Sequence, residues 1–330
     1  MNQDLMKRLF RSIEGDRSDD IVKVAFNIID GERIKGHVKL ADQLNTLLEK
    51  NLIQNESFKG ELKRILPQGV SVPTDKRYNL PLATPVGREA LRHQMILPDA
   101  IETQIHRIEQ EYVGRERLAK FGLQPRKKIL FYGAPGCGKS MSAERIAWNI
   151  GLPFWKVRFE AIISSYLGES AMNLNQLFET IKKQPCLLLL DEFDIIAKAR
   201  DYGQDVGEMN RIVNILLTLL EEYDAPGLLI ATTNLEGILD KALFRRFDDL
   251  IEIPKPGQVE ISKLLKTTLL SMETKGVRWG KLASQMEGFS AALVVKIAND
   301  AAKIVVINNR QELTQADLEQ ALSETKLYQS

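Results

Sequence analysis

The chain has 330 residues, of which 44% are hydrophobic and 27% charged, a balance typical of a globular protein with about two domains. Its 45 Lys and Arg residues against 44 Asp and Glu residues leave a net charge of +1, which excludes a global basic field for nucleic acid or acidic membranes. The longest apolar runs, such as Leu187–Leu190, are far shorter than the ~18 residues of a membrane span, and the polar start resembles no signal peptide. We therefore expect a cytoplasmic protein without a membrane partner.

Cysteine and histidine usage removes several classes of site. The two cysteines, Cys137 and Cys186, form no C-x-x-C pair, which excludes a zinc ribbon and a disulfide scaffold. The histidines are scattered, none begins an H-E-x-x-H helix, and no G-x-S-x-G segment occurs. We expect no metal site made only of protein side chains, and any proteolysis would belong to a partner.

Residues 1–66 are predicted to form a small all-α domain. Apolar residues recur there at helical spacing, for example Ala41, Leu44 and Leu48. A core-forming stripe explains this spacing, and a groove that recruits a substrate or partner protein is the alternative. Residues 67–98, which contain five prolines, are predicted to be a linker.

From residue 99 onwards, short apolar runs alternate with helical patterns, as in a parallel α/β sheet. The predicted fold class is α/β, with a parallel five-stranded sheet in residues 99–255 and a small helical lid in residues 256–330. No strand is expected in the lid. The predicted strands are 128–132, 154–158, 187–191, 228–232 and 250–253, and the predicted lid helices are 259–272, 279–286, 291–307 and 314–323.

A glycine-rich turn follows the first of these strands and opens a helix, matching G-x-x-x-x-G-K-[ST]. Its glycines let successive backbone N–H groups face one point, and the helix N-terminus adds partial positive charge. We expect a P-loop NTPase site for ATP, with Lys139 on the outer phosphates and Ser140 giving its hydroxyl to Mg²⁺. A small side chain tolerated in the loop explains Cys137 better than a reactive thiol. The residues assigned to the phosphates are Gly133, Ala134, Pro135, Gly136, Cys137, Gly138, Lys139, Ser140 and Met141.

Two adjacent carboxylates, Asp191 and Glu192, end the apolar strand predicted at residues 187–191. Ligands of open parallel sheets lie at the carboxyl ends of the strands, so both side chains are expected to face the same crevice. Asp191 then serves as the magnesium partner, and Glu192 as the base that activates a water toward the γ-phosphate. A solvated strand end is the alternative.

Two later segments, Ala-Thr-Thr-Asn at residues 231–234 and LDKALFRRFD at residues 239–248, complete a recognisable set. With the phosphate loop and the paired carboxylates, they strongly resemble the AAA+ ATPases of the AAA clade proper, over about residues 98–326. The resemblance implies that Asn234 is the sensor that helps to hold the attacking water and the γ-phosphate. It also implies that Arg245 and Arg246 are fingers that reach the ATP of the neighbouring subunit, with plain surface charges as the alternative. A site completed in trans implies a homo-oligomeric ring, a hexamer as in the family.

The segment Ser-Tyr-Leu-Gly-Glu-Ser at residues 165–170 is similar to the pore loop of AAA unfoldases. This similarity implies that Tyr166, Leu167 and Gly168 line a central channel and contact an extended polypeptide; an aromatic side chain packed inward is the alternative. The chain departs from the family at residues 171–175, where a charged stretch is usual. It also departs at residues 288–293, where G-x-S-G-A-D is common, which points to a different contact between lid and nucleotide.

Two functions remain open at this level. The first is a ring ATPase that uses ATP and Mg²⁺ to unfold or remodel protein substrates through a central pore, recruiting them through the N-terminal domain. The second is an ATP-dependent switch or scaffold that regulates a separate partner enzyme, such as a protease, without threading anything. A DNA-remodelling ATPase is disfavoured, because the chain has neither a basic domain nor an aromatic-basic patch for nucleic acid.

Overall fold

The computed structural model describes residues 25, 29, 33, 37, 40–46, 48, 72–75, 79–162, 169–193, 206–234 and 244–327. The chain divides into two compact units, Met1–Val70 and Ser71–Ser330. In the first unit, residues 40–46 are helical, and Leu44 and Leu48 of the apolar spacing are fully buried. Most of the predicted N-terminal bundle lies outside the described residues.

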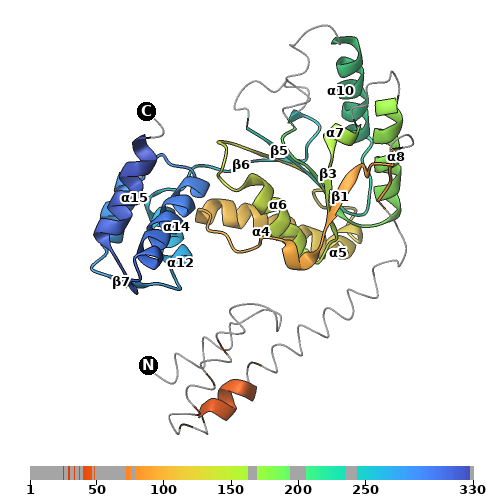
Figure 1. Ribbon diagram of the computed structural model, residues 1–330. Coiled ribbons are helices and arrows are strands. Elements are labelled where there is room, and N and C mark those ends of the chain that lie inside the picture. Colours follow the sequence, from red (N-terminus) through yellow and green to blue (C-terminus); the bar gives the residue numbers. More distant parts are fainter. Residues whose placement is uncertain are drawn as a thin grey trace. The chain divides into compact units, whose positions relative to one another are not determined.

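A six-stranded sheet organises the second unit (Figure 1). The strand order is β1-β3-β4-β5-β2-β6, and all neighbouring pairs are parallel except β1 with β3. The α/β class and all five predicted strands are therefore confirmed. The strands are β1 (Ala83–Val86), β2 (Lys128–Tyr132), β3 (Phe154–Val157), β4 (Leu187–Leu190), β5 (Leu228–Thr233) and β6 (Asp249–Glu252).

The sixth strand, β1, corrects the expectation of five strands. It lies in the proline-rich segment that precedes the sheet and pairs antiparallel with β3, so that Pro85 lies opposite Trp155. Proline has no N–H to donate, and it is tolerated in a sheet only where that donor is not needed, as on an edge strand. β1 occupies an edge, which explains why a proline that argues against a strand locally is accepted here.

Helices cover both faces of the sheet, and each face has its own core (Figure 1). Along β4, Leu187 and Leu189 pack with α4 and α6, whereas Leu188 and Leu190 pack with α7, α8 and α10. Burying a leucine contributes roughly 1.5–3 kcal/mol, so this continuous apolar strand anchors the sheet from both sides. The helices before the lid are α4 (Asp99–Val113), α5 (Arg115–Ala119), α6 (Lys139–Ile150), α7 (Phe159–Ile162), α8 (Glu169–Lys183) and α10 (Val206–Glu221), with a 3-10 turn, η1 (Arg88–Ala90).

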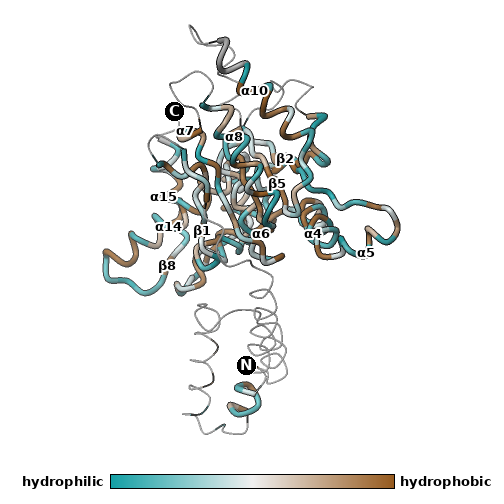
Figure 2. The backbone as a smooth tube through the Cα atoms, turned by 90° about the vertical axis from the view of Figure 1, so that its right-hand side faces the viewer, coloured by the Kyte–Doolittle hydropathy of each residue, from teal (hydrophilic) through white to brown (hydrophobic). Residues whose placement is uncertain are grey.

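The tubes of α8 and α10 alternate between hydrophobic and hydrophilic colours (Figure 2). Such alternation is expected of helices that place one face on a sheet and the other in water. No helix among the described residues is long and apolar enough to cross a membrane.

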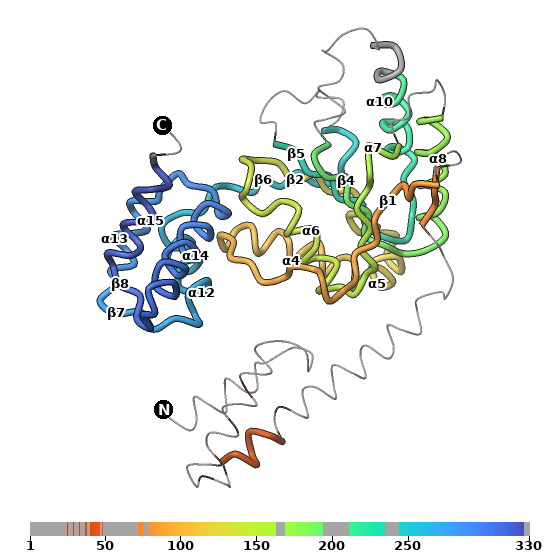
Figure 3. The backbone as a smooth tube through the Cα atoms, viewed as in Figure 1, coloured from red at the N-terminus to blue at the C-terminus, as the bar shows by residue number. Residues whose placement is uncertain are grey.

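The C-terminal elements form the lid, the blue group in Figure 3, with a separate apolar core. The expectation that the lid contains no strand is wrong, because β7 and β8 form a short parallel pair. Each has only three residues, and β7 (Glu-Thr-Lys) is fully exposed, so no apolar alternation marks it in the sequence. The lid elements are α12 (Gln258–Thr268), β7 (Glu273–Lys275), α13 (Trp279–Gln285), α14 (Ala291–Ile307), β8 (Glu312–Thr314) and α15 (Gln315–Leu327).

Candidate functional site

The phosphate loop, residues 133–138, connects β2 to α6 at the carboxyl end of the parallel strands. Gly133 and Gly138 have φ angles of 129° and 103°, a region that residues with side chains rarely adopt. A Cβ on Gly133 would also lie 2.5 Å from the carbonyl oxygen of Ile253. Gly138 is the N-cap of α6, so the positive end of that helix faces the loop. This geometry suits a bound anion.

The side chain of Lys139 lies inside the loop and is 7% exposed. Its ammonium donates hydrogen bonds of 2.8 Å to the carbonyl oxygens of Gly133 and Ala134. A buried ammonium needs such partners, because leaving it unpaired costs several kcal/mol. The lysine is thereby held against the phosphate loop, where it lines the pocket.

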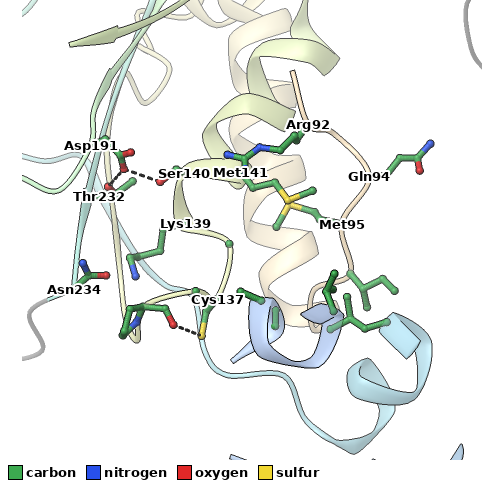
Figure 4. A pocket seen from close by; sticks show the side chains of 18 of the residues that line it. Arg92, Gln94, Met95, Cys137, Lys139, Ser140, Met141, Asp191, Thr232 and Asn234 are labelled. Atoms are coloured by element: carbon green, nitrogen blue, oxygen red, sulfur yellow. Dashed lines mark hydrogen bonds between the residues drawn. The ribbon is translucent and has the colours of Figure 1, made fainter. Parts of the chain in front are cut away.

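Asp191, the first residue after β4, accepts hydrogen bonds from three side chains. Ser140 Oγ and Thr232 Oγ1 each lie 2.6 Å from Asp191 Oδ1 (Figure 4). The ammonium of Lys156, on β3, lies 2.5 Å from Asp191 Oδ2. The carboxylate thus joins the phosphate-loop helix, β5 and β3 at one point.

These contacts decide the charge of Asp191. Burial raises the pKa of this carboxyl, but the hydrogen bonds from Lys156, Ser140 and Thr232, with the charge of Lys156, outweigh burial and leave the pKa below its usual value. Asp191 is therefore ionised at neutral pH. An ionised carboxylate beside a hydroxyl is a suitable oxygen-donor set for a hard divalent cation.

Glu192 has a φ angle of 52°, a left-handed conformation that is uncommon for a residue other than glycine. The turn is held by its N–H, which donates to Thr232 Oγ1 at 3.0 Å, and by the N–H of Phe193, which donates to Thr232 O at 2.8 Å. Because the chain turns here instead of continuing the strand, Asp191 and Glu192 both line the same pocket. Strain of about 1–3 kcal/mol is retained at such positions when the surroundings hold them.

A pocket of about 830 Å³ extends from the phosphate loop to the lid. This volume lies within the range of small-molecule sites. Gly133 and Ala134 accept hydrogen bonds from Lys139 but are not among the described residues that line the pocket. The predicted site residues that do line it are Pro135, Gly136, Cys137, Gly138, Lys139, Ser140, Met141, Asp191, Glu192 and Asn234.

One wall of the pocket comes from a segment that sequence reasoning assigned to the linker. Residues 92–96, here called the strap, include Met95, which points toward Met141 (Figure 4). Arg92 holds the strap on α6 by a bidentate ion pair with Glu144, at 2.9 and 2.5 Å. One turn further along α6, Trp148 stacks on His93 at a centroid distance of 3.9 Å. No local pattern marks the strap, because its role depends on a helix about 50 residues away.

The lid forms another wall of the pocket. The backbone N–H of Ala292 donates to the carbonyl oxygen of Gly136 at 2.9 Å, which joins the start of α14 to the phosphate loop. Ser290 caps α14 through its side chain, and a Cβ on Gly136 would lie 3.0 Å from Ser290 Oγ. The departure from the family noted at residues 288–293 thus occurs at a direct contact. The lid residues that line the pocket are Leu264, Thr267, Thr268, Ala291, Ala292 and Val295.

The two arginines predicted as fingers differ in their surroundings. Arg245 is exposed, whereas Arg246 is partly buried and pairs with Glu221 on α10 at 2.9 Å. Neither arginine is among the described residues that line the pocket of its own chain. The predicted pore-loop residues Tyr166, Leu167 and Gly168 lie outside the described part of the chain.

The family match and the similar proteins point to the same family. Residues 129–255 match the family described as "ATPase family associated with various cellular activities (AAA)". An uncharacterized AAA family ATPase, y4kL, from Sinorhizobium fredii is 35% identical over 71% of this chain and 70% of that protein. The proteasome-activating nucleotidase of Thermococcus onnurineus is 35% identical over 63% of this chain, and the ATP-dependent zinc metalloprotease FtsH 1 of Conexibacter woesei is 30% identical over 68%. The matches span 54% of the nucleotidase and 35% of the metalloprotease.

Proposed function

Because the chain belongs to the AAA family of ATPases, we propose that it binds ATP with Mg²⁺ between the phosphate loop and the lid, and that it works as a ring that remodels proteins. ATP hydrolysis is the activity that the family and the relative named an AAA family ATPase support. The observation that carries the residue assignment is the convergence of Ser140, Thr232 and Lys156 on Asp191, beside the loop that holds Lys139. This arrangement places anion-binding and cation-binding groups side by side.

The residues of the site suit phosphoryl transfer to water. Lys139 and the loop N–H groups bind the outer phosphates, and Glu192 takes a proton from the attacking water at its carboxylate. The water oxygen bonds to the γ-phosphorus, and the bond from that phosphorus to the bridging oxygen of ADP breaks. Asn234, at the end of β5, orients the water. The turn at Glu192 holds the base in the pocket, next to Asp191.

The donor set fits magnesium. Ser140 Oγ and an ionised oxygen of Asp191 lie 2.6 Å apart at the base of the loop, and both are hard oxygen donors. Bound Mg²⁺ neutralises charge that develops on the β- and γ-phosphates. We assign Ser140 and Asp191 to hold it.

A ring assembly is supported by the position of Arg245. A guanidinium that is exposed and outside its own pocket is suited to contact a neighbouring subunit, where it stabilises the charge of phosphoryl transfer. Each site is then incomplete until subunits meet, and a closed ring, six subunits as the family resemblance implies, completes all of them.

Protein remodelling is favoured by the names of two relatives, one a proteasome-activating nucleotidase and the other an ATP-dependent metalloprotease. The first name links a nucleotidase to the proteasome, and the second links ATP to a protease. This chain has no H-E-x-x-H segment, so a protease would be a separate partner. We propose that Tyr166, Leu167 and Gly168 contact the polypeptide in the pore and that residues 1–66 recruit it.

A switch or scaffold that regulates a partner enzyme, such as a protease, is the second candidate. Substitution Tyr166→Ala separates the two functions, because a threading machine loses protein unfolding while its ATPase activity persists. A switch keeps its effect on the partner in this variant and loses it when residues 1–66 are removed.

The ring itself is tested by ATP turnover per subunit as a function of protein concentration, with an Arg245→Ala, Arg246→Ala double variant beside the wild type. We expect a steep rise with concentration that the double variant abolishes. Flat turnover, unchanged in the variant, would show that each subunit is complete alone and would remove the ring and the threading function together.

A further inference from the structure

Lys156 occupies an unusual place beside the pocket. Its ammonium lies 2.5 Å from Asp191 Oδ2, while Oδ1 of the same carboxylate accepts from Ser140 and Thr232. The carboxylate assigned to magnesium therefore already has a cation of the protein's own against one of its two oxygens. Arg92, a further cation that interacts electrostatically with Asp191, is bound in a bidentate pair with Glu144.

The position of Lys156 in β3 breaks the pattern of its face. Phe154, two residues earlier, belongs to the core beneath α4 and α6, and Leu189, the partner of Lys156 on β4, belongs to the same core. An apolar residue is expected at this register position, since side chains two apart on a strand share a face. Instead, this position holds Lys156, whose four-carbon side chain places its ammonium against Asp191.

The Lys156 side chain is also able to move away from Asp191. It is 48% exposed, whereas that of Asp191 is 14% exposed. Partly exposed ion pairs of lysine are weak, and the flexible stem of lysine carries its charge into water without unfolding the strand. The two hydroxyl contacts on Oδ1 do not depend on Lys156, so Asp191 keeps its position when the lysine moves.

We propose that Lys156 is the counter-ion that balances the charge of Asp191 in the nucleotide-free site and that its ammonium moves off the carboxylate when magnesium and nucleotide bind. Lys156 thereby sets the magnesium concentration that nucleotide binding requires. The inference rests on the proposed function, since it takes Asp191 as a magnesium partner. In this scheme Lys156 acts only through the charge of Asp191 and takes no part in the transfer of the phosphoryl group.

The test measures binding, without turnover. A fluorescent ADP analogue is titrated against the full chain at a series of Mg²⁺ concentrations, for the wild type and for Lys156→Met, Lys156→Arg and Lys127→Met. Lys156→Met keeps the length of the side chain and removes the competing charge. Lys127→Met is the matched control, because Lys127 pairs with Asp224 at 2.7 Å just before β2, at the opposite end of the strand from the phosphate loop.

The half-saturating Mg²⁺ concentration is expected to be about fivefold lower in Lys156→Met than in the wild type, the scale of a partly exposed ion pair. Lys156→Arg, which keeps the charge, and Lys127→Met are expected to match the wild type. An unchanged or higher Mg²⁺ requirement in Lys156→Met would overturn the role of Lys156 while leaving the proposed function intact. If the wild type binds no nucleotide at any Mg²⁺ concentration, the proposed function and this inference both fail.

A second measurement needs neither metal nor nucleotide. In EDTA, Lys156→Met is expected to lower the melting temperature, because Asp191 loses its cation. The same substitution in an Asp191→Asn background is expected to have no effect. Equal losses in both backgrounds would show that Lys156 acts through packing and would overturn the counter-ion role.

Discussion

Arg246 Nη1 lies 2.9 Å from Glu221 Oε1, whereas the adjacent Arg245 is exposed. The Nε atom of Arg246 is buried and has no hydrogen-bond partner among the described residues. Two consecutive arginines of one motif are thus placed differently, since one is held against α10 and the other is exposed. If the proposed ring forms, this geometry favours Arg245 over Arg246 as the residue that reaches a neighbouring subunit.

Single substitutions separate the two arginines. Arg245→Ala is expected to reduce ATP turnover on the order of 10³-fold with nucleotide affinity unchanged, because a guanidinium supplied in trans stabilises the transition state. Arg246→Ala is expected to act mainly on stability, by up to about 1 kcal/mol, the scale of a partly exposed ion pair. Turnover assays and urea unfolding of both variants provide the measurements.

Glu221→Ala is the control for this assignment. If Glu221 holds Arg246, the double variant Arg246→Ala, Glu221→Ala is expected to lose less stability than the sum of the two single losses. A turnover loss in Arg246→Ala larger than in Arg245→Ala would contradict the assignment of the two roles.

Substitutions in the phosphate loop and at the end of β4 are expected to separate nucleotide binding from hydrolysis. Lys139→Ala removes the buried ammonium from the loop and is expected to abolish tight ATP binding. Glu192→Gln keeps the size of the side chain but cannot accept the proton, so it is expected to bind ATP and to hydrolyse it at least about 10²-fold more slowly. Equilibrium binding and single-turnover hydrolysis distinguish the two. Near wild-type turnover in Glu192→Gln would show that another group is the base.

The left-handed backbone at Glu192 predicts that a substitution that removes the proposed base can stabilise the protein. Glu192→Gly relieves the strain at a φ angle of 52° and is expected to raise the free energy of unfolding by about 0.5–1 kcal/mol, net of the greater entropy of glycine in the unfolded chain. Glu192→Ala removes the same carboxylate but keeps the Cβ, and no gain is expected. Denaturant unfolding measures both; equal stabilities of the two variants would mean that the turn stores no strain.

Asp317 predicts a pH dependence in the lid. Hydrogen bonds from Arg310, at 3.1 and 2.5 Å, and from the hydroxyl and N–H of Thr314 outweigh burial and lower the pKa of this carboxyl to about 2. Since the folded-state pKa lies below the unfolded value near 3.9, the stabilising effect is complete above about pH 5 and is lost as pH falls toward 2. The difference in unfolding free energy between the wild type and Asp317→Asn is therefore expected to shrink from pH 5 to pH 2. A difference that stays constant would contradict the lowered pKa.

Two glycines with opposite surroundings test the packing of the fold. A Cβ on Gly227, just before β5, would lie 1.9 Å from the carbonyl oxygen of Cys186, so Gly227→Ala must displace backbone and is expected to cost roughly 3 kcal/mol. Gly280, in α13, has nothing within 4 Å of its added Cβ, and Gly280→Ala is expected to stabilise the chain by about 0.5–1 kcal/mol. Thermal melting of both variants provides the comparison.

The elements that could be predicted from the sequence have strong local signals. β2 and β4 are apolar runs bounded by helical patterns, and the phosphate loop requires glycines at fixed spacing for its positive φ angles. The short strands β7 and β8 have no such signal, and β1 includes a proline. Their formation depends on a pairing partner that is distant in sequence or on an edge position in the sheet.

By itself, the sequence determined the α/β order of elements, the phosphate loop and the pair Asp191 and Glu192, because each is written in a short run of neighbouring residues. Only the tertiary structure decided which other groups meet them. Lys156, Thr232 and the strap reach the site because parallel strands end at one edge of the sheet and because α6 binds the segment before α4. Such contacts join residues tens of positions apart, and no local periodicity records them.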